Sequence, residues 1–243
     1  MSSVFESKNT EGDDGWISVS DLMAGLMMVF MFISIIYAKT ADERAQTITE
    51  VVAEWEEAEW KIFQSLQREF KYDLPKWKAE IDRETLTIRF LTQTPEVLFQ
   101  PGKKEIQPKF QKILSEFMPR YIRLLKSEFE AEISEVRIEG HTSSEWNKKT
   151  SKTDAFIKNM ALSQARTRSV LEYALAINAL EELKPWMTKK VSANGLSSAR
   201  LISTNGIENK RLSRRVEFTV RTKTREALMD IMRKAGISYD RKI

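Results

Sequence analysis

The first part of the hydrophobic pattern is an almost uninterrupted apolar run over residues 16–38, in which Asp21 is the one acidic residue. As a helix rising 1.5 Å per residue, about 22 residues span roughly 33 Å, which matches a bilayer hydrocarbon core of about 30 Å. Trp16 and Tyr37 bracket the run, as aromatic rings at the two headgroup levels would. The pattern therefore predicts one transmembrane helix, preceded by a short tail over residues 1–15, which the family resemblance described below implies is cytoplasmic.

An acidic side chain within such a helix is costly. On insertion scales a charged group costs about 2.5–3.5 kcal/mol at the helix centre, and less near an end. Helical spacing places Asp21 on one face with Ala24, Gly25 and Met28, so that a partner helix can come close to the carboxyl group. This favours a carboxyl group that binds and releases a transported H⁺ or Na⁺. The alternative is a headgroup-level charge that only interacts with the helix dipole.

The second part, residues 39–80, predicts an amphipathic helical linker, because apolar residues recur at steps of three and four. The helix of this linker is expected to end before Pro75, because proline cannot continue a helix. Ile48, Trp55 and Ile62 keep a seven-residue spacing, which is typical of a pairing seam between two chains. Two interpretations are open at this point: the stripe pairs two chains, or it packs on the chain's own domain. A role as a plug is a further hypothesis.

The third part, residues 81–222, predicts a compact α/β domain. Strand-like segments alternate with helical runs over residues 108–127 and 153–177. The expected strands are TLTIRFL, ISEVRIEGH, KKVSANG and RRVEFTVRT. Residues 223–243 then predict a C-terminal helix with a glycine near its end.

Composition narrows the function classes. The 39 Lys and Arg against 35 Asp and Glu give a net charge of +4, which is no nucleic-acid-like excess, so no nucleic-acid partner is expected. The chain has no cysteine and one histidine, His141, which argues against thiol chemistry and histidine-rich metal sites. No phosphate-binding loop, dinucleotide fingerprint or metalloprotease motif occurs. We therefore expect no enzyme activity, no cofactor and no metal.

Four motifs occur in an order that resembles a known domain. FQPGKKEIQP, IEGHT, NMALSQAR and RRVEF are together similar to the OmpA-like peptidoglycan-binding domain. With one N-terminal helix that carries an acidic residue, the chain resembles the MotB family of stator subunits. SDLMAGLMMVFMFI and ALSQARTRSV are most similar to the stator-like subunits of the Zorya anti-phage defence system. The implied fold is α/β, with a small mixed sheet packed by helices.

The resemblance also implies a peptidoglycan site. In this family an arginine binds a carboxylate of the stem peptide, and the guanidinium fork suits that role. Ser143 stands where the family has an aspartate that receives the ammonium of diaminopimelate, which puts tight binding in doubt, and Glu145 is a hypothetical substitute. The site residues implied by the motifs are Thr142, Ser143, Asn159, Leu162 and Arg166.

The resemblance further implies a homodimer in the bacterial inner membrane, with the N-terminus cytoplasmic and the C-terminal domain periplasmic. A MotA/ZorA-like multi-helix membrane subunit would form a ring around the dimer, and ion flow at Asp21 would drive rotation of that ring. A flagellar stator, a passive peptidoglycan tether and a TolR-like energy transducer are the alternatives.

Overall fold

A computed structural model describes residues 11–91, 98–147 and 149–223, with side chains from Val19 onward except at positions 44, 47, 48, 50, 51, 54 and 55. The chain divides into two compact units, Met1–Val52 and Ala53–Ile243. Nearly all of the helix predicted over residues 223–243, and most of the predicted tail, lie outside the described residues.

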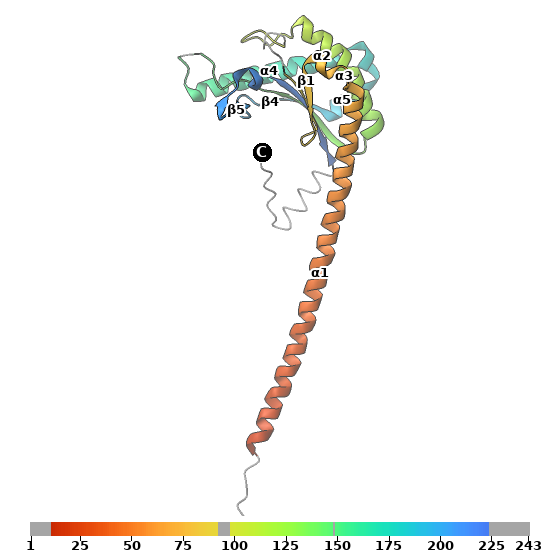
Figure 1. The fold of residues 1–243 in the computed structure, drawn as a ribbon, viewed down its shortest axis with the longest axis vertical. Coiled ribbons are helices and arrows are strands. Elements are labelled where there is room, and N and C mark those ends of the chain that lie inside the picture. Colours follow the sequence, from red (N-terminus) through yellow and green to blue (C-terminus); the bar gives the residue numbers. More distant parts are fainter. Residues whose placement is uncertain (1–10, 92–97, 148, 224–243) are drawn as a thin grey trace, which may run out of the picture. The chain divides into compact units, whose positions relative to one another are not determined.

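The N-terminal unit belongs to one long helix, α1 (Glu11–Phe70), which continues into the second unit (Figure 1). The predicted membrane helix and linker are therefore parts of a single helix. The segment long and apolar enough to cross a membrane is Val19–Glu43, and its side chains are exposed on every side of the helix. Leu22 and Met27, for example, are 75% and 71% exposed. A helix that is apolar all round needs lipid or partner helices to cover it.

The second unit contains a five-stranded mixed sheet in the order β1-β2-β7-β3-β4. All neighbours are antiparallel except β3 and β4, which run parallel. On the central strand, apolar Val216 and Phe218 alternate with Glu217 and Thr219, so one face of the sheet is apolar and the other polar. The strands are β1 (Ala79–Asp82), β2 (Thr87–Phe90), β3 (Ile133–Gly140), β4 (Val191–Gly195) and β7 (Val216–Thr222).

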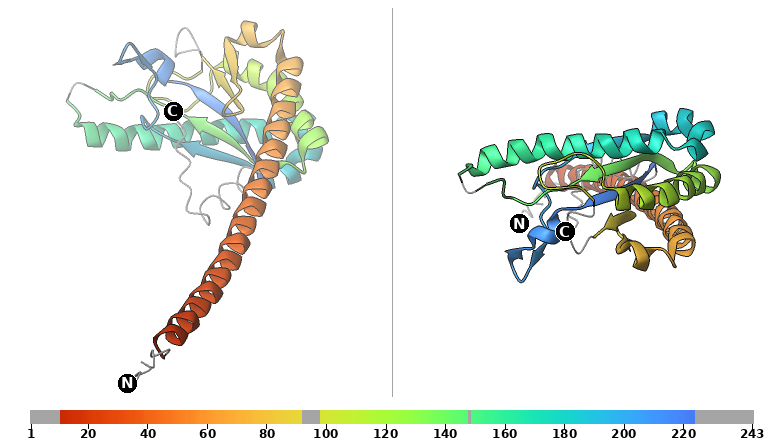
Figure 2. Two further views of the ribbon diagram at one scale, coloured as in Figure 1. Left: turned by 60° about the horizontal axis from the view of Figure 1, so that its bottom comes forward. Right: turned by 90° about the horizontal axis from the view of Figure 1, so that it is seen from above.

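Two long helices accompany the sheet. α3 (Pro108–Phe129) begins with a proline in its first turn, and α4 (Lys152–Leu175) is capped by Ser151, whose Oγ accepts a hydrogen bond from the Asp154 N–H. α4 packs along β3 and β4 (Figure 2). The shorter elements are α2 (Leu74–Trp77), the 3₁₀ helix η2 (Asn178–Leu183), α5 (Lys184–Lys190), α6 (Lys210–Ser213) and a hairpin of β5 (Ser203–Thr204) and β6 (Ile207–Glu208).

The observed elements confirm the predicted fold class. The four predicted strands and both predicted long helices are present, with helix ends within two residues of expectation. The structure adds β1, the β5–β6 hairpin and α5, which are short segments without a clear apolar period.

The end of α1 belongs to the core of the second unit. Ile62, Leu66 and Phe70 are fully buried, and the Phe70 ring centroid lies 5.2 Å from that of Phe117 on α3. The second compact unit, Ala53–Ile243, therefore includes this end of the helix. The buried end of the stripe therefore packs on the chain's own domain, because the side chain of Ile62 is fully covered and has no surface left to contact a second chain.

Candidate functional site

A cavity of about 190 Å³ lies where β3 ends and β7 begins, beside α4. Because Gly140 pairs with Val216 across these two antiparallel strands, the residues that follow one strand and precede the other meet at the same sheet edge. The lining residues are Leu98, Phe99, Pro101, Gly140, His141, Ser163, Arg166, Arg214, Arg215 and Val216.

Arg166 is the cationic residue that α4 contributes to this cavity. Its Nε donates to the Lys103 carbonyl oxygen at 2.8 Å and its Nη2 donates to that of Gln100 at 3.0 Å. The guanidinium also lies 4.9 Å from the centroid of the Phe99 ring. Burial, and secondarily the charge of Arg214, lower the pKa of Arg166 to about 10, so it remains charged at neutral pH. No carboxylate of the described residues lies within ion-pair distance of Arg166.

Two of the other predicted site residues hold the backbone of the neighbouring loop. The side-chain amide of Asn159, which is 3% exposed, donates to the carbonyl oxygens of Ser143 and Glu145, both at 3.1 Å. The backbone N–H of Thr142 donates to the Ser197 carbonyl at 2.8 Å. Because these contacts use backbone groups, they fix the path of the loop whatever its side chains are.

The remaining two predicted residues differ in position. Leu162 is half-buried on α4 and, like Asn159, is not among the cavity-lining residues that the structure describes. Ser143 is buried, and its Oγ lies 3.5 Å from Nη1 of Arg214, a cavity residue. Of the five predicted residues, Arg166 is therefore the one that lines the cavity, and Ser143 adjoins it through Arg214.

Glu145, the hypothetical substitute for the missing aspartate, is engaged elsewhere. Its Oε2 lies 2.6 Å from Nζ of Lys210, and its Oε1 lies 3.8 Å from Nη1 of Arg214. The Glu145 side chain is about half exposed and is absent from the described cavity lining. One solvated carboxylate therefore serves two cations beside the cavity.

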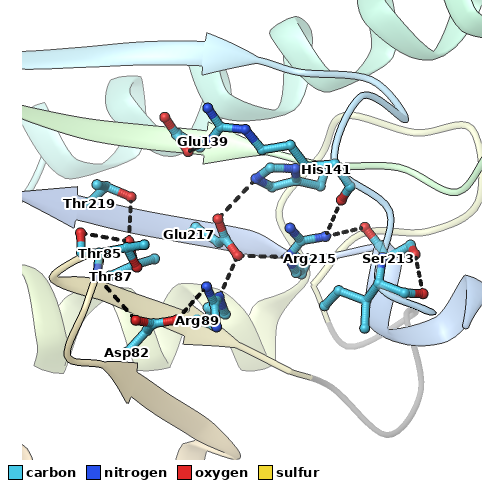
Figure 3. A network of polar contacts seen from close by, with 12 residues as sticks. Asp82, Thr85, Thr87, Arg89, Glu139, His141, Ser213, Arg215, Glu217 and Thr219 are labelled. Carbon is cyan, nitrogen blue, oxygen red and sulfur yellow. Dashed lines mark hydrogen bonds and ion pairs between the residues drawn. The ribbon is translucent and has the colours of Figure 1, made fainter. Parts of the chain in front are cut away.

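A buried ion network supports the cavity wall from the polar face of the sheet (Figure 3). Oε1 of Glu217 accepts hydrogen bonds from Nε of Arg89 and from Nε of Arg215, both at 2.7 Å. Oε2 of Glu217 lies 3.1 Å from Nε2 of His141. Burial alone would raise the pKa of Glu217, but contact with His141 and the charge of Arg215 outweigh it and hold that pKa well below its usual range.

Close helix–sheet approach sets the position of Arg166. A Cβ added at Gly195 on β4 would lie 2.3 Å from the backbone nitrogen of Gln164 on α4. A Cβ at Gly140 would lie 2.6 Å from Cγ2 of Thr167. At Gly195 the contact is with backbone, so no larger residue fits unless the backbone moves. At Gly140 the nearest atom is a side-chain methyl, with the Ser163 carbonyl oxygen next at 3.0 Å. The two glycines thus let α4 lie close against the ends of β3 and β4.

Comparisons with known proteins bear on this fold and site. The OmpA family matches residues 98–215, which include the cavity. Over 216 residues the chain is 45% identical to the Zorya protein ZorB of Escherichia coli strain Crooks, and the match covers 88% of this chain and 91% of that protein. The chain belongs to the ZorB family.

A solved structure supports the ZorB-family fold described above. A MotB-like protein from Desulfovibrio vulgaris is 23% identical, with a TM-score of 0.50 over 70% of this chain and 98% of its own. At this level of identity the likeness concerns the fold alone.

The geometry also decides against a metal centre at the buried acidic cluster of this ZorB-family chain. Ligand atoms of Glu139, His141 and Glu217 all lie within 4.8 Å of one another. However, Nη1 of Arg200 lies 3.3 Å from Oε2 of Glu139, and two further arginines already pair with Glu217. A bound cation would be repelled by three guanidinium groups that already neutralise the two carboxylates. The cluster is a structural ion network.

Arg214 was not among the residues that the motifs imply for the site. Both arginines of RRVEF line the cavity, but Arg215 pairs with buried Glu217, whereas Arg214 contacts Ser143 and Glu145. Both arginines lie between α6 and β7, outside any strand, so strand alternation gave no signal that distinguishes them.

Proposed function

We propose that this chain is the cell-wall-anchored subunit of an ion-driven, stator-like complex in the bacterial inner membrane that serves anti-phage defence. The observation that carries the proposal is Asp21, an acidic side chain within a fully exposed apolar span of a ZorB-family chain. An ionisable group at membrane depth is rare and is by default functional.

The membrane part of the proposal rests on the face around Asp21. A Cβ added at Gly25, one turn further along α1, would meet nothing within 4 Å, so the surface beside the carboxyl group is open to a partner helix. In the proposal, two copies of the chain form a homodimer whose helices are enclosed by a ring of MotA/ZorA-like multi-helix subunits. H⁺ or Na⁺ passing through Asp21 then drives rotation of the ring. The N-terminus is cytoplasmic and the second unit is periplasmic.

The anchoring part of the proposal rests on the cavity. Arg166 offers a charged, oriented guanidinium to a stem-peptide carboxylate, with which it can form a bidentate pair. Asn159 and Thr142 hold the loop that carries Ser143, and Leu162 adds half-buried apolar surface on α4. Because the end of α1 is packed into the core of the same unit, a wall-bound domain would resist the force applied to the membrane helix.

Replacement of Asp21 tests the ion step. We expect Asp21→Asn to abolish phage protection, measured as plating efficiency at equal membrane abundance, because the amide cannot bind and release a cation at that site. Asp42→Asn is the matched control: Asp42 is an exposed residue of the same helix at the edge of the span, and it should tolerate the change. Full protection by the Asp21→Asn variant would leave only a passive peptidoglycan tether.

Replacement of Arg166 tests the anchoring. We expect Arg166→Ala to reduce retention of the detergent-solubilised chain on purified peptidoglycan sacculi by about tenfold or more, as for loss of a charge-assisted bidentate pair. Arg168→Ala is the matched control, because Arg168 is exposed on the same helix and pairs with Glu172. Equal retention of both variants and the wild type would refute the site assignment.

A further inference from the structure

The cavity wall carries more positive charge than the described residues neutralise: its three arginines have two carboxylate partners, Glu217 and Glu145, and Glu145 also pairs with Lys210. Arg166 directs its two described hydrogen bonds to backbone carbonyls and has no carboxylate partner within the described part of the chain. The buried Nε of Arg214 likewise has no hydrogen-bond partner there. Arg215, the third arginine of the lining, differs because Glu217 neutralises it. An unpaired buried donor is unfavourable, so the wall favours an incoming acceptor.

The same wall offers no negatively charged partner for a cation among the described lining residues. The described lining contains no carboxylate. Ser143 presents a neutral hydroxyl to Arg214, and the half-exposed carboxylate of Glu145 is shared between Lys210 at 2.6 Å and Arg214 at 3.8 Å. A ligand ammonium placed next to the bound carboxylate would therefore face Arg166, which has no described carboxylate partner, and Arg214, which shares Glu145 with Lys210; this is unfavourable.

We propose that this cavity selects a carboxylate whose neighbouring amine is acylated over one whose neighbouring amine is charged, and that Ser143 sets this preference. The inference rests on the proposed peptidoglycan binding and specifies its ligand. In diaminopimelate-type peptidoglycan the side-chain amine is free in an uncross-linked stem and forms an amide at a cross-link, whereas the adjacent carboxylate is free in both. The proposed ligand is therefore the cross-linked stem peptide.

Acylation changes the ligand in two ways that suit this wall. It removes the positive charge that Arg166 and Arg214 repel. It also adds an amide carbonyl oxygen, which can accept a hydrogen bond from the unpartnered Nε of Arg214. A hydrogen bond to a charged donor, together with relief of one like-charge contact, corresponds to about a tenfold change in affinity.

The experiment compares two probes on the full chain in detergent micelles. The probes are the tripeptide L-Ala-γ-D-Glu-meso-diaminopimelate with its side-chain amine free and the same tripeptide with that amine acetylated, and binding is measured by titration calorimetry at low salt. We expect the acetylated peptide to bind about tenfold more tightly than the free one. Ser143→Asp should reverse this preference by adding a carboxylate. Ser143→Asn has nearly the same size without the charge and should retain the wild-type preference.

Retention on purified sacculi, measured in parallel, separates the outcomes. Equal binding of the two peptides, tighter binding of the free amine, or binding of neither peptide overturns the inference, and retention on sacculi would then leave the proposed function standing. A Ser143→Asn variant that behaves like Ser143→Asp also overturns it, because size rather than charge would then set the preference. Loss of both sacculus and peptide binding in the wild type refutes the proposed anchoring itself.

Discussion

Leu66→Ala tests whether the end of the long helix is structurally part of the second compact unit. Leu66 is fully buried, one turn after fully buried Ile62 and one turn before fully buried Phe70. The Phe70 ring contacts that of Phe117 on α3, so this end of α1 shares its core with α3. Truncation of Leu66 would leave a cavity at a packed helix–helix contact.

The expected effect is large. Truncating a fully buried leucine to alanine typically lowers the free energy of unfolding by about 3–5 kcal/mol, including the cavity that remains. In a folded unit of 150–250 residues, 1 kcal/mol shifts the melting temperature by about 2–4 °C. The Leu66→Ala variant should therefore melt roughly 6–20 °C below the wild type.

The assay is thermal unfolding of the full chain in detergent, followed by near-ultraviolet circular dichroism of the aromatic core. Leu22→Ala is the matched control: it is the same substitution in the same helix, at a side chain that is 75% exposed, and it should leave this transition unchanged. A Leu66→Ala shift as small as that of the control would refute the assignment of this helix end to the core and restore the pairing interpretation.

Three further predictions concern the frame of the site. Because the pKa of Glu217 is lowered in the folded state, its charge contributes fully to stability above the unfolded pKa of about 4.3, and this contribution is lost as the pH falls through the folded pKa. Glu217→Gln should thus lower the free energy of unfolding by about 3 kcal/mol at pH 7. In denaturant unfolding, the difference in stability between this variant and the wild type should become smaller below about pH 4. Gly195→Ala should lower the free energy of unfolding by about 1–3 kcal/mol, because its Cβ would collide with the Gln164 backbone; an unchanged denaturation midpoint would contradict that contact. Asn159→Ala should lower the free energy of unfolding by about 1–3 kcal/mol and weaken retention on sacculi, because it leaves the Ser143 carbonyl without its hydrogen-bond donor. Retention equal to that of the wild type would show that the loop does not need this hydrogen bond.

The sequence by itself determined the elements with strong local signals. α3 and α4 were predictable because each combines a helical apolar period with a start signal, a proline in the first turn or a serine cap. The membrane span followed from its length and composition alone. β1 was not predictable, because an alternation over only four residues, AEID, is too short to mark a strand.

Motif order indicated Arg166, but tertiary structure gave the site its charge balance. The burial of Glu217 between Arg89 on β2 and His141 after β3 depends on strand pairing between segments more than 70 residues apart. Spacing along the chain does not encode which strands become neighbours. The role of Arg214 was hidden for the same reason, since its contact with Ser143 joins residues 71 positions apart.

The apolar stripe at the end of α1 separates what the sequence determines from what the tertiary structure decides. Its period determined that one face of the helix would be covered, and it was equally compatible with a second chain and with the chain's own domain. The tertiary structure decided the matter for Ile62, Leu66 and Phe70, which lie in the core of the second unit. Apolar periodicity predicts that one face of the helix is buried, because removal of apolar area from water is favourable whichever surface packs on it. Which surface packs on it depends on long-range tertiary contacts.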